Sequence, residues 1–249
     1  MRKKLRSFYL IVSSFVIAVL NLPLAFAKST GNKPFPTPAP ITKKTYTAGS
    51  LMTSMRSVYD SLHLNLSGLS QQAFDYAKKG LAKLVEEGKL LNDSIISIVD
   101  FSLPSNKKRL FVLDLRNYKV LFNTLVAHGK NTGTEYATNF SNQNESLKSS
   151  PGFYVTRDTY EGKHGISLRL DGMERGINDH AMERGIVMHA ADYVSQEIAD
   201  TRGWIGRSWG CPAVPPAMNK PIINTIKGGT CLFIYHPSYV DRSELLNQG

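Results

Sequence analysis

The chain has 249 residues, of which only two are cysteine, and its formal net charge is +10. Part of that charge lies in a basic cluster within residues 2–6, and the remaining excess is moderate and spread along the sequence. The sequence lacks the dense Lys/Arg tract and the interleaved aromatic residues of a nucleic-acid binder, so we expect no nucleic-acid partner. A weak attraction to an anionic polymer and a generic basic surface fit this charge equally well.

Residues 1–27 have the pattern of a secretory signal peptide. The basic cluster is followed by an apolar stretch over residues 8–24 and then by Ala25-Phe26-Ala27, an A-x-A cleavage site. An uncleaved membrane anchor is the alternative, because the stretch approaches the length of a membrane span. Asn21 and Pro23 weaken a spanning helix. We therefore expect cleavage after Ala27, no stable membrane insertion afterwards, and export to a periplasm or cell-wall space.

The composition then divides the chain into a linker, a helical segment, a larger domain and a tail. Residues 28–50 combine several prolines with lysine, threonine and serine, which predicts an extended linker. Residues 51–92 predict helices, a short one over 51–62 and a longer one that Ser70 caps and Gly88 ends. Residues 93–240 suit a single catalytic domain, and residues 241–249 form a C-terminal tail.

From residue 95 the sequence changes to short β-rich runs separated by turn residues such as Pro104 and Asn117. The predicted strands cover residues 95–101, 109–115, 119–129, 152–155, 165–170, 185–189 and 230–235. A helix is predicted over 218–226, with Pro215-Pro216 at its entrance. We expect a mainly β fold with two packed sheets in a sandwich-like arrangement, short helices, and the N-terminal helical segment packed on the sheets. The long polar segment 129–150 either borders a cleft or forms a mobile surface loop.

The stretch GRSWGCPAV places Cys211 in a tight turn framed by glycine and proline. Gly210 has no side chain to obstruct a substrate, and Pro212 holds Cys211 in extended backbone. A thiol needs a base to become the attacking thiolate, and His189 ends the apolar run GIVMH upstream. Backbone N–H groups of the turn would stabilise an oxyanion. This pattern favours a thiol nucleophile for acyl transfer, although a purely structural turn and a satisfied, partly buried histidine also fit it.

Two other arrangements of the sulfur and imidazole groups have to be weighed. In an oxidising compartment Cys211 and Cys231 are candidates for a disulfide. Cys231 lies in GGTCLFIYHP, a predicted buried strand where cysteine behaves as a small apolar residue, so we expect free thiols. The histidines lack H-x-x-x-H spacing and two isolated cysteines do not form a zinc cluster, so we expect neither a metal nor another cofactor.

The order His189-Ala190, a spacer and Ser208-Trp209-Gly210-Cys211 resembles the H-G … [S/T]-H-G-C signature of the L,D-transpeptidases, the YkuD-type catalytic domains. The resemblance is strongest to the branch of murein L,D-transpeptidase catalytic domain family proteins, whose pattern GRSWGCPA stands here at residues 206–213. Segments such as SIVDFSLPSNKKRLFVLDL and YEGKHGISLRLDG extend the resemblance over about residues 65–236.

The resemblance implies a role for several residues of the turn. Cys211 would be the nucleophile and His189 the base, Gly210 would belong to the oxyanion turn, and Ser208 would support it. Trp209 stands where the wider signature has its second histidine, so the role of that imidazole is absent. The pair after the cysteine, usually aliphatic-Arg or aliphatic-Asn, is here Pro212-Ala213, which puts the usual grip on the substrate in doubt.

The residues on either side of Ser208 are the candidates for substrate binding. Arg207 offers a positive charge for a peptide carboxylate, or is a structural arginine. Trp209, like Trp204, lines a cleft wall or belongs to the core.

The implied activity is peptidoglycan cross-linking without a metal or an organic cofactor. Cys211 would attack a stem tetrapeptide, the terminal D-alanine would leave, and an amine acceptor (a second stem peptide or a D-amino acid) would take the acyl group. Carbapenem-type inhibitors would react at the same cysteine. A carboxypeptidase or endopeptidase that uses water as the acceptor is one alternative, and a wall-binding protein with a degenerate site is another.

Overall fold

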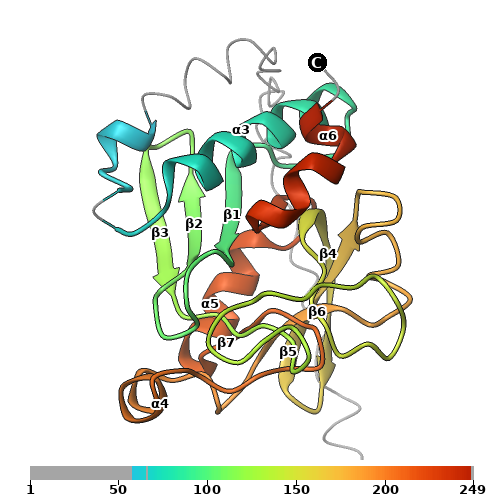
Figure 1. The fold of residues 1–249 in the computed structure, drawn as a ribbon. Helices are drawn as coiled ribbons and strands as arrows, with labels where there is room; N and C mark the ends of the chain where they lie inside the picture. The colour runs from blue at the N-terminus through green and yellow to red at the C-terminus, as the bar shows by residue number, and fades with distance from the viewer. Residues whose placement is uncertain (1–57, 66, 248–249) are drawn as a thin grey trace, which may run out of the picture. The chain divides into compact units, whose positions relative to one another are not determined.

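A computed structural model describes residues 58–65 and 67–247 (Figure 1). The predicted signal peptide, the linker and most of the predicted 51–62 helix lie outside the described residues, as does the end of the predicted tail. All described residues belong to one compact unit, Thr45–Gly249. Among them, no helix combines the length and the apolar character that crossing a membrane requires.

Helix α3 (Gln71–Glu86) forms where the sequence predicts it. The Ser70 side chain caps it by accepting a hydrogen bond from the Ala73 N–H at 3.1 Å. Its apolar face is buried in a core that also contains residues of strands β1 (Ile95–Asp100), β2 (Leu110–Asp114), β4 (Gly152–Gly162) and β8 (Cys231–Tyr235). Helix α3 therefore covers one face of the sheet.

The described strands form one eight-stranded mixed sheet in the order β3-β2-β1-β8-β4-β5-β6-β7. The remaining strands are β3 (Lys119–Thr124), β5 (Gly165–Gly172), β6 (Val187–Ala190) and β7 (Ala213–Val214). The pairs β1–β8 and β6–β7 are parallel and the others are antiparallel. The predicted mainly β class is confirmed, with the strands joined in one sheet where the sequence suggested two.

The two edges of this sheet meet, which gives it a nearly barrel-like form. Ala127, just after edge strand β3, forms an antiparallel bridge with Ala213 in the opposite edge strand β7, and its N–H donates to the Ala213 carbonyl at 2.8 Å. Closure of this kind satisfies backbone groups that an open edge would leave unpaired. It also ties the segment before β7, which carries Cys211, to the far side of the sheet.

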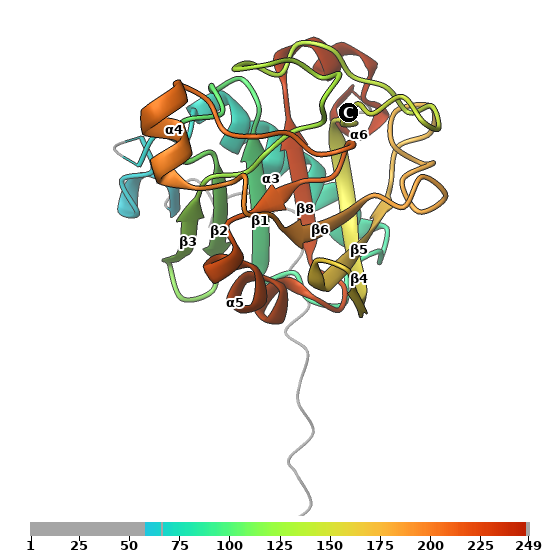
Figure 2. The ribbon, with the colours of Figure 1, turned by 90° about the horizontal axis from the view of Figure 1, so that it is seen from below.

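Both faces of the central strands are buried. In β8, Cys231, Phe233 and Tyr235 belong to the core under α3, whereas Leu232 and Ile234 belong to a second core with helix α5 (Pro216–Ile226). Figure 2 shows α3 and α5 on opposite sides of these strands. Shorter helical segments also belong to the unit, among them residues 58–61, α4 (Gln196–Arg202), the 3₁₀ helix Pro237–Arg242 and α6 (Glu244–Asn247).

Candidate active site

Cys211 lies in a turn that backbone pairing anchors at both ends. Before it, Ser208 forms a parallel bridge with Gly129. After it, Ala213 in β7 lies opposite His189 in β6. Because the two strands run parallel, this register brings the turn that carries the thiol beside the strand that carries the imidazole.

Side-chain hydrogen bonds fix the interior of the turn. The Ser208 hydroxyl donates to the carbonyl of Cys211 at 2.6 Å and accepts from the N–H of Gly210 at 3.1 Å. The Ser149 hydroxyl donates to the Gly210 carbonyl at 2.9 Å and accepts from the N–H of Gly129 at 3.0 Å. The Ser208 side chain thus links the Gly210 amide to the Cys211 carbonyl within the turn. The Gly210 N–H, which the sequence suggested as an oxyanion donor, is instead engaged within the turn.

Gly210 is required by its backbone conformation and by its neighbours. Its φ is +125°, a region that L side chains rarely adopt. A Cβ atom there would lie 2.8 Å from the carbonyl oxygen of Lys148 and 3.2 Å from Cδ1 of Ile186. The polar segment 129–150 therefore packs directly behind the turn and borders the site.

His189 is buried, with 7% of its surface exposed, and its ring is oriented by the chain itself. Nδ1 lies 2.8 Å from the carbonyl oxygen of Ala190. A carbonyl only accepts, so Nδ1 carries the proton and the neutral ring keeps its lone pair on Nε2. Burial, followed by the charges of His164 and Lys163, lowers the pKa of His189, although the bond to Ala190 acts in the opposite direction. The imidazole is therefore neutral at neutral pH and able to accept a proton.

The Cys211 thiol is also neutral in this resting structure. Its sulfur donates a long hydrogen bond, 3.7 Å, to the carbonyl of Gly185. Burial raises the pKa of Cys211, and the backbone N–H groups of Val187 and of Cys211 itself, with the charge of Arg184, oppose that rise only in part. The site thus holds a thiol and a neutral imidazole, not a preformed ion pair.

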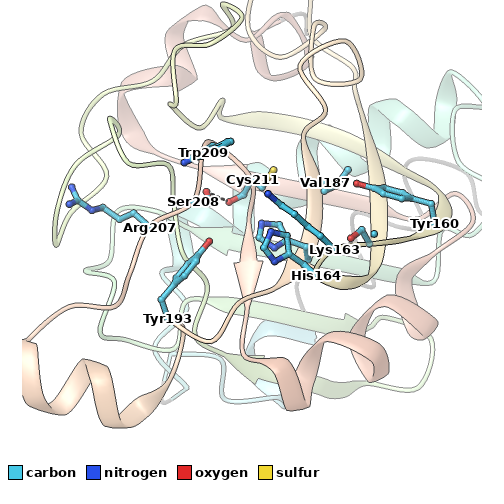
Figure 3. A pocket seen from close by; sticks show the side chains of 12 residues that line it. Tyr160, Lys163, His164, Val187, Tyr193, Arg207, Ser208, Trp209 and Cys211 are labelled. Atoms are coloured by element: carbon cyan, nitrogen blue, oxygen red, sulfur yellow. Dashed lines mark hydrogen bonds between the residues drawn. The ribbon is translucent and has the colours of Figure 1, made fainter.

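Cys211 and His189 line the same cavity, which has a volume of about 510 Å³ (Figure 3). The walls come from the β4–β5 hairpin, from β6, from the segment after it and from the cysteine turn. The lining residues are Tyr160, Gly162, Lys163, His164, Ser167, Val187, His189, Tyr193, Arg207, Ser208, Trp209 and Cys211. Aspartate and glutamate are absent from this lining, so its charged side chains are all basic.

Residues 65–235, more than half of the chain, match the model of the L,D-transpeptidase catalytic domain family. The chain belongs to this family. No curated protein sequence matches it.

Solved L,D-transpeptidase structures are similar at low identity. One from Mycobacterium smegmatis is 12% identical over 57% of this chain and 59% of its own, with a TM-score of 0.36. One from Stackebrandtia nassauensis is 13% identical over 76% of this chain and 78% of its own, with a TM-score of 0.35. L,D-transpeptidase 3 from Mycobacterium tuberculosis, in complex with a faropenem-derived adduct, is 10% identical over 57% of this chain and 60% of its own, with a TM-score of 0.37. This chain thus spans about three fifths of the length of the two mycobacterial proteins.

The two residues proposed for substrate binding differ in their surroundings in this L,D-transpeptidase domain. Arg207 borders the cavity, but its guanidinium points away from Cys211 in Figure 3 and donates to the carbonyls of Lys130 and Gly133 at 3.2 and 3.1 Å. These bonds correspond to the structural alternative for that arginine. Trp209 leaves 72% of its surface exposed and lines the cavity, as a wall residue would.

The structure also brings residues to the site that the sequence reasoning missed. Lys163 and His164 come from the tip of the β4–β5 hairpin, and the His164 ring lies 4.9 Å from that of His189. Arg184 supplies the positive charge near Cys211 and is held by hydrogen bonds to the carbonyls of Ser141 and Lys148. For Lys163 and His164 the only local signal was the turn-like sequence GKHG, which does not reveal what the hairpin faces.

Cys231 is the second cysteine of the chain. Both cysteines are free, and Cys231 is fully buried in β8, where burial raises the pKa of its thiol. The predicted free thiols are therefore confirmed. Within the described part of the chain, His, Cys, Asp and Glu residues do not form a group of three that would hold a metal ion.

Proposed function

We propose that this protein is an exported peptidoglycan L,D-transpeptidase that works through an acyl-enzyme on Cys211. The observation that carries the proposal is one cavity, in a domain of this family, that is lined by both a thiol and a neutral imidazole with its lone pair on Nε2. The proposed donor is a peptidoglycan stem tetrapeptide with a diamino acid at its third position. The proposed site of action is a periplasm or cell-wall space, on the strength of residues 1–27.

In the first half-reaction, the sulfur of Cys211 attacks the carbonyl carbon of the diamino acid as its proton passes to Nε2 of His189. The imidazolium that forms is stabilised by the carbonyl of Ala190, which already accepts from Nδ1. The Gly210 N–H is engaged by Ser208, so we assign the oxyanion to the amide of Cys211. When the C–N bond breaks, His189 returns the proton to the departing amine of D-alanine, and a thioester remains.

In the second half-reaction, an acceptor amine attacks the thioester and loses a proton to His189. The C–S bond breaks, the thiol is regenerated, and a new amide joins donor and acceptor. The acceptor is a second stem peptide or a D-amino acid. Each step uses the same two side chains, so the chemistry needs no group beyond the chain and its substrates.

Intact-protein mass spectrometry with a tetrapeptide donor tests the proposal. The expected result is a mass increase equal to the donor less D-alanine, absent from the Cys211→Ala variant. A folded wild-type protein that never gains this mass would contradict the proposal and favour a wall-binding role. Addition of an acceptor amine then separates the activities, because products formed only with water would indicate a carboxypeptidase or endopeptidase.

Carbapenems supply an independent probe of the same sulfur. We expect a carbapenem adduct on Cys211, located by peptide mapping, and no adduct on the buried Cys231. The Cys211→Ala variant is the control. Unmodified Cys211 after prolonged exposure would argue against a working nucleophile.

A further inference from the structure

The β4–β5 hairpin brings into the cavity a cation that is not paired with a carboxylate. Lys163 lies at the hairpin tip, and its Nζ is 5.5 Å from the centroid of the Trp209 ring. Figure 3 shows the Lys163 side chain reaching across the cavity toward the turn that carries Cys211. The aromatic face attracts the ammonium group and holds it beside the turn that carries Cys211. The side chain is therefore partly ordered before a ligand binds.

Other cations of the same hairpin are neutralised by carboxylates. Arg157 pairs with Asp171, and Arg169 pairs with Asp158. None of the ion pairs between described side chains includes Lys163. Lys163 therefore lines the cavity beside Trp209 without forming an ion pair with a carboxylate of the described residues.

The rest of the cavity wall reinforces this preference for a negative group. The lining residues include no aspartate or glutamate, and Tyr160 and Tyr193 bring hydroxyl groups. The hydroxyls of Ser167 and Ser208 already donate to backbone carbonyls. Glu161, the nearest acidic residue in the sequence, lies outside the lining, and its carboxylate faces Gly165 across the hairpin. A carboxylate that entered the cavity would therefore meet a cation and hydroxyl donors without repulsion from the lining.

We propose that Lys163, held against Trp209, determines specificity by binding a carboxylate of the donor stem peptide. This inference rests on the proposed function and adds a substrate requirement to it. Two carboxylates of a donor with a dicarboxylic diamino acid have the required chemistry: the C-terminal carboxylate of the leaving residue and the side-chain carboxylate of the diamino acid. Amidation removes the charge of either one while leaving the peptide backbone unchanged.

The test uses donors in which neither, one or the other of these carboxylates is amidated. The rate of acyl-enzyme formation is measured by mass for the wild type, for Lys163→Gln, and for the charge-retaining Lys163→Arg. Lys108→Gln, which removes an exposed lysine from the β1–β2 turn, is the matched control. We expect amidation of one carboxylate to lower kcat/KM about tenfold in the wild type, the effect of one charged hydrogen bond at a partly exposed site.

In Lys163→Gln that discrimination should disappear, because the free carboxylate loses its partner while the amidated donor is unaffected. Lys163→Arg and Lys108→Gln should retain it. The carboxylate whose amidation matters identifies the source. The proposal is overturned if the wild type tolerates both amidations, or if Lys163→Gln keeps the wild-type ratio.

A binding measurement separates this proposal from the proposed function. Titration of the same donors into Cys211→Ala, by calorimetry, reads the carboxylate preference without any chemistry. If the preference depends on Lys163 and no acyl-enzyme forms in the wild type, the carboxylate site is supported and the transpeptidase activity is contradicted. If acyl-enzyme forms at equal rates from all donors, acylation of Cys211 is supported and the carboxylate site is contradicted.

Discussion

Replacing Gly210 by alanine inserts a methyl group where the cysteine turn touches the 129–150 segment. Strain from an L residue at φ +125° costs about 1–3 kcal/mol. The new Cβ would lie 2.8 Å from the backbone oxygen of Lys148, which cannot swing aside as a flexible side chain would, and such overpacking costs a further 1–3 kcal/mol, approximately. We therefore expect a loss of about 2–6 kcal/mol in the free energy of unfolding.

Gly176→Ala is the matched control for this change. Gly176 also has a positive φ, +72°, but a Cβ there would meet nothing within 4 Å. It should lose only about 1 kcal/mol, the cost of the left-handed conformation itself. In a domain of this size 1 kcal/mol corresponds to about 2–4 °C in Tm, so Gly210→Ala should melt clearly below the control.

Thermal unfolding by circular dichroism and the acylation rate of the folded protein together read the effect. We expect Gly210→Ala to acylate about a hundredfold more slowly at a temperature where it is folded, because the turn that aims the sulfur has moved. Gly176→Ala should acylate at the wild-type rate. A Gly210→Ala protein with the Tm of the control and an undiminished rate would refute the argument for close packing at this turn.

Three further predictions follow from burial. Alkylation of Cys211 by iodoacetamide should accelerate as pH rises, without a fast plateau at acid pH, because burial raises the pKa of its thiol; such a plateau would indicate a preformed ion pair. Burial and the charge of Arg109 lower the pKa of His128 to about 3, from 6.5. As pH falls below 6.5, His128 is therefore protonated in the unfolded state before it is protonated in the folded state. The free energy of unfolding, measured with urea, should be highest near pH 7 and decrease toward pH 4. A free energy of unfolding that does not change over this pH range would contradict the prediction. Gly80→Ala should lower the free energy of unfolding by about 1–2 kcal/mol in the same urea assay, because the new Cβ would lie 2.0 Å from the ring of Phe153. This clash opposes the higher helix propensity of alanine. A more stable variant would show that the ring can move.

Local patterns were sufficient to predict much of the fold. The Ser70 cap and the apolar spacing after it specify α3, and short apolar runs specify most strands. The closure of the sheet was not predictable, since β7 has only two residues and the Ala127–Ala213 bridge joins segments far apart in the sequence. Helix α4 was missed although its signals are present: the Ser195 hydroxyl accepts from the Ile198 N–H, and Gly203 ends the helix at φ +82°.

In the candidate site, too, only the residues with a local sequence signal were predicted. Cys211 and His189 were identified from a turn and a strand end that can each be recognised in the local sequence. Lys163 and Arg184 were not, because their importance depends on what packs against them. Arg207 was chosen as the cation because it adjoins the turn in sequence, whereas the structure engages it with backbone carbonyls and places Arg184 near the sulfur.

Removal of water has opposite effects on the pKa values of the thiol and the imidazole. Burial raises the pKa of Cys211 and lowers that of His189, so both groups favour their neutral forms at rest. The groups that would stabilise the ion pair are nevertheless already in place: the amides of Val187 and Cys211, the charge of Arg184, and the Ala190 carbonyl. In the proposed reaction, a donor that fills the cavity would displace more water and strengthen the interactions with these fixed dipoles as negative charge moves from sulfur to the substrate oxygen. The thiolate would then arise during attack and not before it, which keeps the resting sulfur in its less reactive form.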